Sequence, residues 1–151
     1  MLEGEGKSLR LILGTSYGEA APVETPSEMF YADATLEAGA KLPMPDDHED
    51  RGAYVVEGAV TIAGETFEAG RMMVFRPGDR VSMQAGPQGA RVLILGGATL
   101  EGPRHIWWNF VASSKERIED AKEAWRQGDW QHGRFQLPPN DDDEFIPLPG
   151  R

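Results

Sequence analysis

Few residues in this chain are able to do acid–base or metal chemistry. It has no cysteine, so thiolate chemistry is excluded and a metal would need histidine, carboxylate or backbone oxygen ligands. The acidic run at residues 46–50 contains one of the three histidines, and there His48, Asp46 and Glu49 offer enough donors for a surface cation. Successive side chains of an extended segment point to opposite faces. We therefore expect an exposed polar loop here rather than a metal site.

The other histidines suggest no catalytic site. The chain lacks a G-x-S-x-G elbow and a phosphate-binding glycine loop. His105 and Asn109 flank Trp107 and Trp108 in the segment HIWWNF, which could form a ligand box or serve as a packing and docking element. We expect His105 to be hydrogen-bonded to backbone at the edge of a core and His132 to be exposed. No catalytic residue is predicted.

Charge and hydropathy narrow the classes of partner. The 25 acidic and 15 basic residues give a net charge of -10, which repels the phosphate backbone of nucleic acids. No window approaches the roughly 18 apolar residues of a membrane span. Residues 2–6 resemble no secretory signal. We expect a soluble, cytoplasmic protein that binds neither nucleic acid nor membrane.

The first two thirds of the chain read as short strands. Residues 29–36 alternate apolar and polar side chains, as expected for a half-buried strand. Glycines recur every six residues at Gly52, Gly58, Gly64 and Gly70, a spacing typical of tight turns between short strands. These features predict an all-β sandwich or barrel over residues 1–110.

The pattern changes after this barrel. Ser113 stands three residues before Glu116, which is a capping box, and Gly128 is placed to end a short amphipathic helix. Beyond it lies an irregular tail, which we expect to be anchored by its apolar side chains, Trp130, Phe135, Phe145 and Ile146. Residues 111–151 are therefore predicted to be a helix and docking tail of the same single domain.

The glycine-punctuated strands, with GPRHIWWNFVASSKERIEDAKEAW and DDDEFIPLP after them, resemble the C-terminal half of the pirin family. The likeness implies a cupin fold, an RmlC-like double-stranded β-helix or jelly-roll barrel with a short C-terminal helix and tail. Pirin proteins are bicupins. The resemblance implies that iron binding and quercetin 2,3-dioxygenase activity belong to the N-terminal cupin, and transcriptional co-regulation to partner proteins. The C-terminal cupin of the family is generally free of metal.

The cupin metal motif can be compared residue by residue. With its outer glycines on Gly39 and Gly58, its ligand positions hold Pro45, Asp47 and Arg51 instead of two histidines and a glutamate. Proline offers no side-chain donor and arginine is a permanent cation that repels a metal. We expect no metal cofactor, with Arg51 paired to Asp47 instead; iron or another divalent ion is the alternative.

Three functions are compatible with the sequence. The first is a non-catalytic module acting through protein association, either as a homodimer imitating a bicupin or with a separate N-terminal pirin-type cupin. Its docking residues would be Trp107, Trp108, Trp125 and Trp130, with Trp107 and Trp108 on opposite faces of the last barrel strand. The second is a metal-dependent, quercetin 2,3-dioxygenase-like enzyme. The third is binding of a small aromatic ligand in the barrel, at Arg51, Tyr54, Asp47, Phe75 and Met83.

Overall fold

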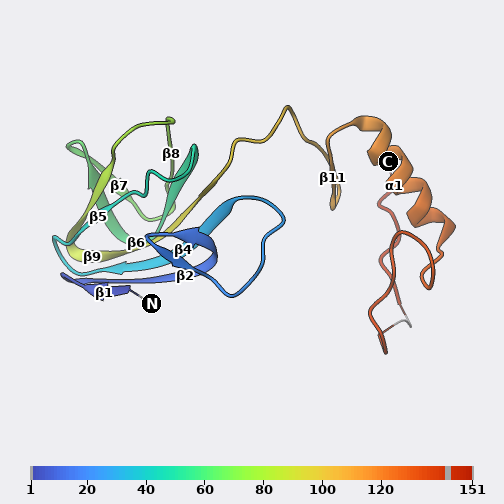
Figure 1. The fold of residues 1–151 in the computed structure, drawn as a ribbon, viewed down its shortest axis with the longest axis horizontal. Helices are drawn as coiled ribbons and strands as arrows, with labels where there is room; N and C mark the ends of the chain where they lie inside the picture. The colour runs from blue at the N-terminus through green and yellow to red at the C-terminus, as the bar shows by residue number, and fades with distance from the viewer. Residues whose placement is uncertain (1, 142–143, 151) are drawn as a thin grey trace. The chain divides into compact units, whose positions relative to one another are not determined.

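The computed structural model describes residues 2–141 and 144–150. It consists of two compact units, residues 1–99 and 100–151 (Figure 1). The strands of the first unit are β1 (Leu2–Gly4), β2 (Lys7–Ser16), β3 (Glu19–Ala20), β4 (Met29–Leu36), β5 (Lys41–Pro43), β6 (Asp50–Ile62), β7 (Glu65–Glu68), β8 (Met72–Phe75) and β9 (Ser82–Gly97). The second unit contains β10 (His105–Trp107), β11 (Phe110–Ala112) and helix α1 (Lys115–Gln127).

Strand β4 shows how the hydrophobic pattern becomes structure. Its alternate side chains Phe30, Ala32, Ala34 and Leu36 are buried, while Tyr31, Asp33 and Thr35 lie on the other face. Antiparallel pairing with β2 on one side and β9 on the other keeps these two faces in register across the sheet. The predicted period-two strand is confirmed.

The two long strands, β6 and β9, run through both halves of the first unit. Residues 90–97 of β9 pair with β4 and with the first half of β6, whereas residues 82–84 pair with β5. The β6–β9 register shifts at Val55–Glu57 and again at Gly58–Val60. Such bulges bend a strand and increase its twist. One continuous strand, β9, can therefore pair with β4 along one part of its length and with β5 along another.

Only some of the regularly spaced glycines occupy turns. Gly64 and Gly70 have positive φ between strands, as predicted, but Gly52 and Gly58 lie inside β6. Gly58 adopts φ 71° at the bulge, and a methyl group there would collide with the carbonyl of Gly89. The six-residue spacing therefore marked turns at two positions, while Gly58 marks a bend and a close backbone approach.

The core of the first unit lies between the inner faces of these strands. It is built from small and branched side chains that are almost completely buried, among them Ala32, Ala34, Ala53, Val55, Val60, Met83, Val92 and Ile94. Strand pairing runs in the order β1-β2-β4-β9-β6-β7, and no pairing of β1 with β7 closes a barrel among the described residues. The expected β-rich fold with a short C-terminal helix is confirmed.

The second unit is a hairpin followed by a helix. Strands β10 and β11 pair with each other, joined through Trp108 at φ 52°. The predicted last barrel strand at residues 102–110 was wrong, because β10 forms this separate hairpin instead of joining the nine-stranded sheet.

Helix α1 begins one residue later than its capping box suggested. The N-cap is Ser114, whose side chain accepts a hydrogen bond from the backbone N–H of Arg117. A backbone hydrogen bond, and to a smaller extent the Ser114 hydroxyl, holds the pKa of Glu116 below its usual value. The helix ends at Gly128 in the left-handed conformation, as predicted. Within the described residues no helix has the length and apolar character needed to cross a membrane.

Candidate functional site

Arg51 is a buried cation held by backbone carbonyls. Its side chain is inward-facing on β6, and the residue is only 2% exposed. Nη1 donates to the Pro45 carbonyl at 2.9 Å, and Nη2 donates to the carbonyls of Arg76 and Asp79 at 3.1 and 2.8 Å. One guanidinium therefore joins the loop before β6 to the loop after β8.

The predicted pairing of Arg51 with Asp47 was wrong. The Asp47 carboxylate lies toward Ser16 Oγ, at 3.5 Å, and toward His48 Nε2, at 3.9 Å. The planar fork of a guanidinium suits several oxygen acceptors at once, and here these are carbonyl oxygens brought in by two loops.

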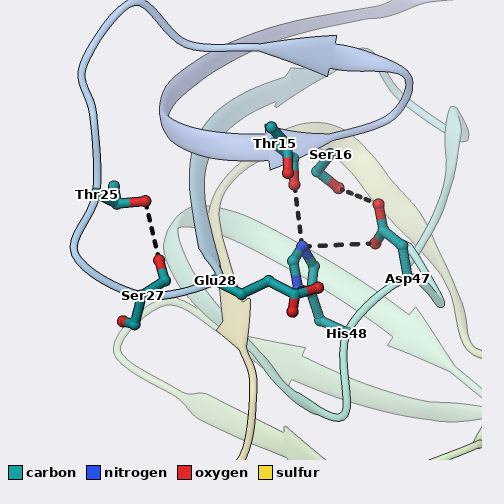
Figure 2. Close-up of polar contacts among 7 residues, drawn as sticks. All are labelled: Thr15, Ser16, Thr25, Ser27, Glu28, Asp47 and His48. Carbon is teal, nitrogen blue, oxygen red and sulfur yellow. Dashed lines mark hydrogen bonds and ion pairs between the residues drawn. The ribbon is translucent and has the colours of Figure 1, made fainter.

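His48 is buried, although the other residues of the loop at 46–50 are exposed, as expected. Its ring stacks on Phe30 with a centroid separation of 4.9 Å, and the whole residue is 7% exposed. Nε2 lies 3.0 Å from the Thr15 carbonyl, so this nitrogen must be the donor (Figure 2). Nδ1 has no hydrogen-bond partner among the described residues and lies 3.8 Å from Glu28 Oε1. The contacts of His48 connect β2 and the segment before β4 to this loop.

The residues at the cupin ligand positions do not fit a metal ion. The Pro45 carbonyl is engaged by Arg51, Asp47 turns toward Ser16, and the position of the glutamate ligand holds the guanidinium itself. Asp46 and Glu49 are exposed, and across the described residues no three His, Asp or Glu side chains gather closely enough to hold a cation. Both the cupin arrangement and the surface alternative at His48 therefore lack a ligand set in this structure.

A cleft of about 520 Å³ opens beside this loop, bordered by Tyr17, Met44, Asp46, Asp47 and Arg80 among others. The Tyr17 hydroxyl donates to the Pro43 carbonyl at 2.8 Å. Burial, and to a smaller extent the charge of Asp47, raises the pKa of Tyr17 far above its usual value. The cleft therefore offers a neutral phenol and charges of both signs.

The residues predicted to line a ligand site differ in their surroundings, although Arg51 and Phe75 stand opposite each other on β6 and β8. Met83 is completely buried and Phe75 packs against the core, while Asp47 borders the cleft. Tyr54 was wrongly expected to face inward: it is 37% exposed, because its neighbours Arg51, Ala53 and Val55 take the inner face of β6. Binding of a small aromatic ligand at this set stays a prediction.

The four tryptophans meet inside the second unit. Trp108 and Trp125 pack edge to face at 5.4 Å, Trp125 and Trp130 at 4.9 Å, and Trp107 lies 6.3 Å from Trp108. Trp125 Nε1 also donates to the Ile146 carbonyl at 2.9 Å. Trp107 and Trp108 were expected on opposite faces, but the turn conformation of Trp108 brings both to the same cluster. Much of the predicted docking surface is thus used to pack this unit; docking itself stays a prediction.

Several residues of the site were missed by sequence reasoning. Thr15, Ser16, Tyr17 and Glu28 contact the loop at residues 43–48, yet none carries a motif. They lie about 20 to 33 positions away along the chain and meet the loop only in the folded structure. A local pattern could not have identified them.

Comparisons with known proteins agree with this fold. Residues 31–135 match the family model described as the Pirin C-terminal cupin domain. A pirin-like protein of Caulobacter vibrioides is 42% identical over 147 residues, which cover 97% of this chain and 49% of the relative. Pirin-1 of Arabidopsis thaliana is 28% identical, with 79% of this chain and 44% of the relative covered.

A solved structure gives the same result. The crystal structure of a quercetin 2,3-dioxygenase from Acinetobacter baumannii superposes with a TM-score of 0.80 at 25% identity, covering 99% of this chain and 50% of that one. The chain thus spans about half the length of the relatives it matches. The family match and the shared cupin fold lead to one conclusion: the chain belongs to the pirin family and corresponds to its C-terminal cupin domain.

Proposed function

We propose that this chain is a non-catalytic pirin-type cupin module that acts through protein association, with a second copy or with a separate N-terminal pirin-type cupin. The proposal that the module is non-catalytic rests on the guanidinium of Arg51. It stands where the cupin motif has a glutamate ligand, and three backbone carbonyls hold it there. A divalent ion placed beside this permanent cation would be repelled.

Association is supported by apolar surface. Val74, Met72, Tyr54 and Leu95 are exposed on the sheet of the first unit. Exposed apolar side chains that lie together indicate an interaction site. The relatives are about twice as long as this chain, so a further cupin is a partner of fitting size.

The catalytic alternative is tested by loading the purified protein with Fe²⁺ and adding quercetin, with oxygen uptake and loss of flavonol absorbance as readouts. We expect neither oxygen uptake nor loss of flavonol absorbance above a metal-only blank. A full-length pirin-type dioxygenase run in parallel should consume both oxygen and quercetin. Turnover that depends on bound iron would overturn the proposal. Metal analysis of protein purified without chelator, together with His48→Ala, checks whether any stoichiometric metal depends on that histidine.

The association is tested by mixing this chain with a separately produced N-terminal pirin-type cupin and measuring mass by light scattering. We expect either a heterodimer in the mixture or a homodimer of this chain alone. Monomers in both samples at tens of micromolar would contradict the association.

A further inference from the structure

The outer face of the sheet formed by β4, β9, β6 and β8 carries a continuous stripe of apolar side chains. Tyr54 of β6 stands directly opposite Met72 of β8 and Leu93 of β9, so these three side chains share one face. One step along the strands, Leu95 stands opposite Tyr31 of β4. Met72 is 48% exposed, and Tyr54 and Leu95 are each 37% exposed.

Charged side chains of alternating sign cross the same face beside the stripe. In the strand order β2, β4, β9 and β6 they are Arg10, Asp33, Arg91 and Glu57. Arg10 pairs in register with Asp33, and Arg91 with Glu57. Arg91 also binds Asp33 through Nε and Nη2, at 3.0 and 2.7 Å. The sign therefore changes at each strand.

This alternation makes the face complementary to itself. When a copy of the sheet is turned over about an axis parallel to the strands, between β4 and β9, the order of the charges is reversed. Arg91 of one copy then lies near Asp33 of the other, and Arg10 lies near Glu57. The same rotation places Leu95 against Tyr31. A two-fold interface requires such a self-complementary patch.

We infer that a second copy of this chain covers this outer face, packed sheet on sheet about that two-fold axis. The inference rests on the proposed association and names its surface and occupant. Stacked sheets lie about 10 Å apart, which lets the side chains of the two stripes interdigitate. Neighbouring cross-chain charges of opposite sign set the register, because a shift by one strand would bring like charges together.

The first test uses light scattering at tens of micromolar, where we expect a dimer. Leu95→Asp places a charge near the axis and should raise the dimer Kd at least tenfold, and Arg91→Glu should do the same by facing Asp33 of the other copy. Lys41→Glu makes the same charge change on β5 and should leave the Kd unchanged. Thermal unfolding identifies any variant that is merely misfolded.

The second test exploits the absence of cysteine. Leu95→Cys introduces a single thiol, which a short bismaleimide should link to its counterpart near the axis, giving a covalent dimer. Glu65→Cys, on exposed β7, should remain unlinked. This interface would be overturned by a monomeric protein, by a dimer insensitive to Leu95→Asp, or by linking only through residue 65. The non-catalytic proposal is decided independently, by the iron-loaded quercetin assay.

Discussion

Replacing Arg51 tests the claim that a guanidinium, rather than a metal, organises this end of the first unit. In Arg51→Met the side chain keeps its approximate length and apolar stem, but three carbonyl oxygens lose their donor. An acceptor left without a partner costs about 1–3 kcal/mol when it is buried. Two of the three bonds are only partly buried, so the lower end applies and the total is about 3 kcal/mol.

The loss of unfolding free energy is measured by urea unfolding of the whole chain, monitored by tyrosine and tryptophan fluorescence. For a chain of this size about 3 kcal/mol lowers Tm by roughly 6–12 °C. Arg51→Lys should not restore stability, because an ammonium lacks the planar fork that reaches both loops. Arg71→Ala, which removes an exposed arginine of the same unit, should change stability by less than about 0.5 kcal/mol.

The result that would refute this reasoning is Arg51→Met with unchanged stability. The guanidinium would then be a dispensable core group, and the two loops would be held by other contacts. A gain of stability would show that desolvating the cation costs more than its three hydrogen bonds contribute.

Three further changes test other parts of the structure. Because burial raises the Tyr17 pKa, Tyr17→Phe should leave the ultraviolet absorbance change between about pH 9 and 11 unchanged. The neutral form of Tyr17 stabilises the fold, and this contribution falls once pH rises above the unfolded-state pKa near 10; a smaller absorbance change in Tyr17→Phe would contradict the burial. Gly58→Ala should destabilise the first unit by about 2 kcal/mol or more, measured by urea unfolding, since its methyl meets the Gly89 carbonyl at positive φ. Ser114→Ala should cost about 1 kcal/mol by removing the acceptor for the Arg117 N–H, and hydrogen exchange in α1 should rise, while an unchanged exchange rate would exclude the cap.

Local patterns predicted those parts of the fold that depend on neighbours in sequence. The alternation in β4 and the glycine at the end of α1 each concern residues within one turn or one strand, where propensity and periodicity act directly. The helix N-cap was displaced by one residue, since adjacent serines, Ser113 and Ser114, satisfy the same rule. The resemblance to pirin proteins supplied the fold beyond these local elements.

The site depended on contacts that no local pattern contains. Arg51 was predicted to face inward, but its acceptors come from the Pro45 loop and from a loop about 25 residues later. His48 was expected in an exposed loop, yet the fold places its ring beside the Thr15 carbonyl of β2 and against the ring of Phe30 in β4. Burial of a polar group is decided by what surrounds it in space, and sequence spacing alone does not carry that information.

The sequence by itself determined the two pleated faces, the capped helix, the lack of a cupin ligand set and membership of the pirin family. Tertiary structure decided which residues meet: carbonyls around Arg51, the Thr15 carbonyl at His48, and the tryptophans packed within one unit. It also revealed the outer stripe, because Tyr54 and Leu93 become neighbours only through strand pairing. The physical reason is that periodicity selects a face, whereas register and bulges select the partner on that face.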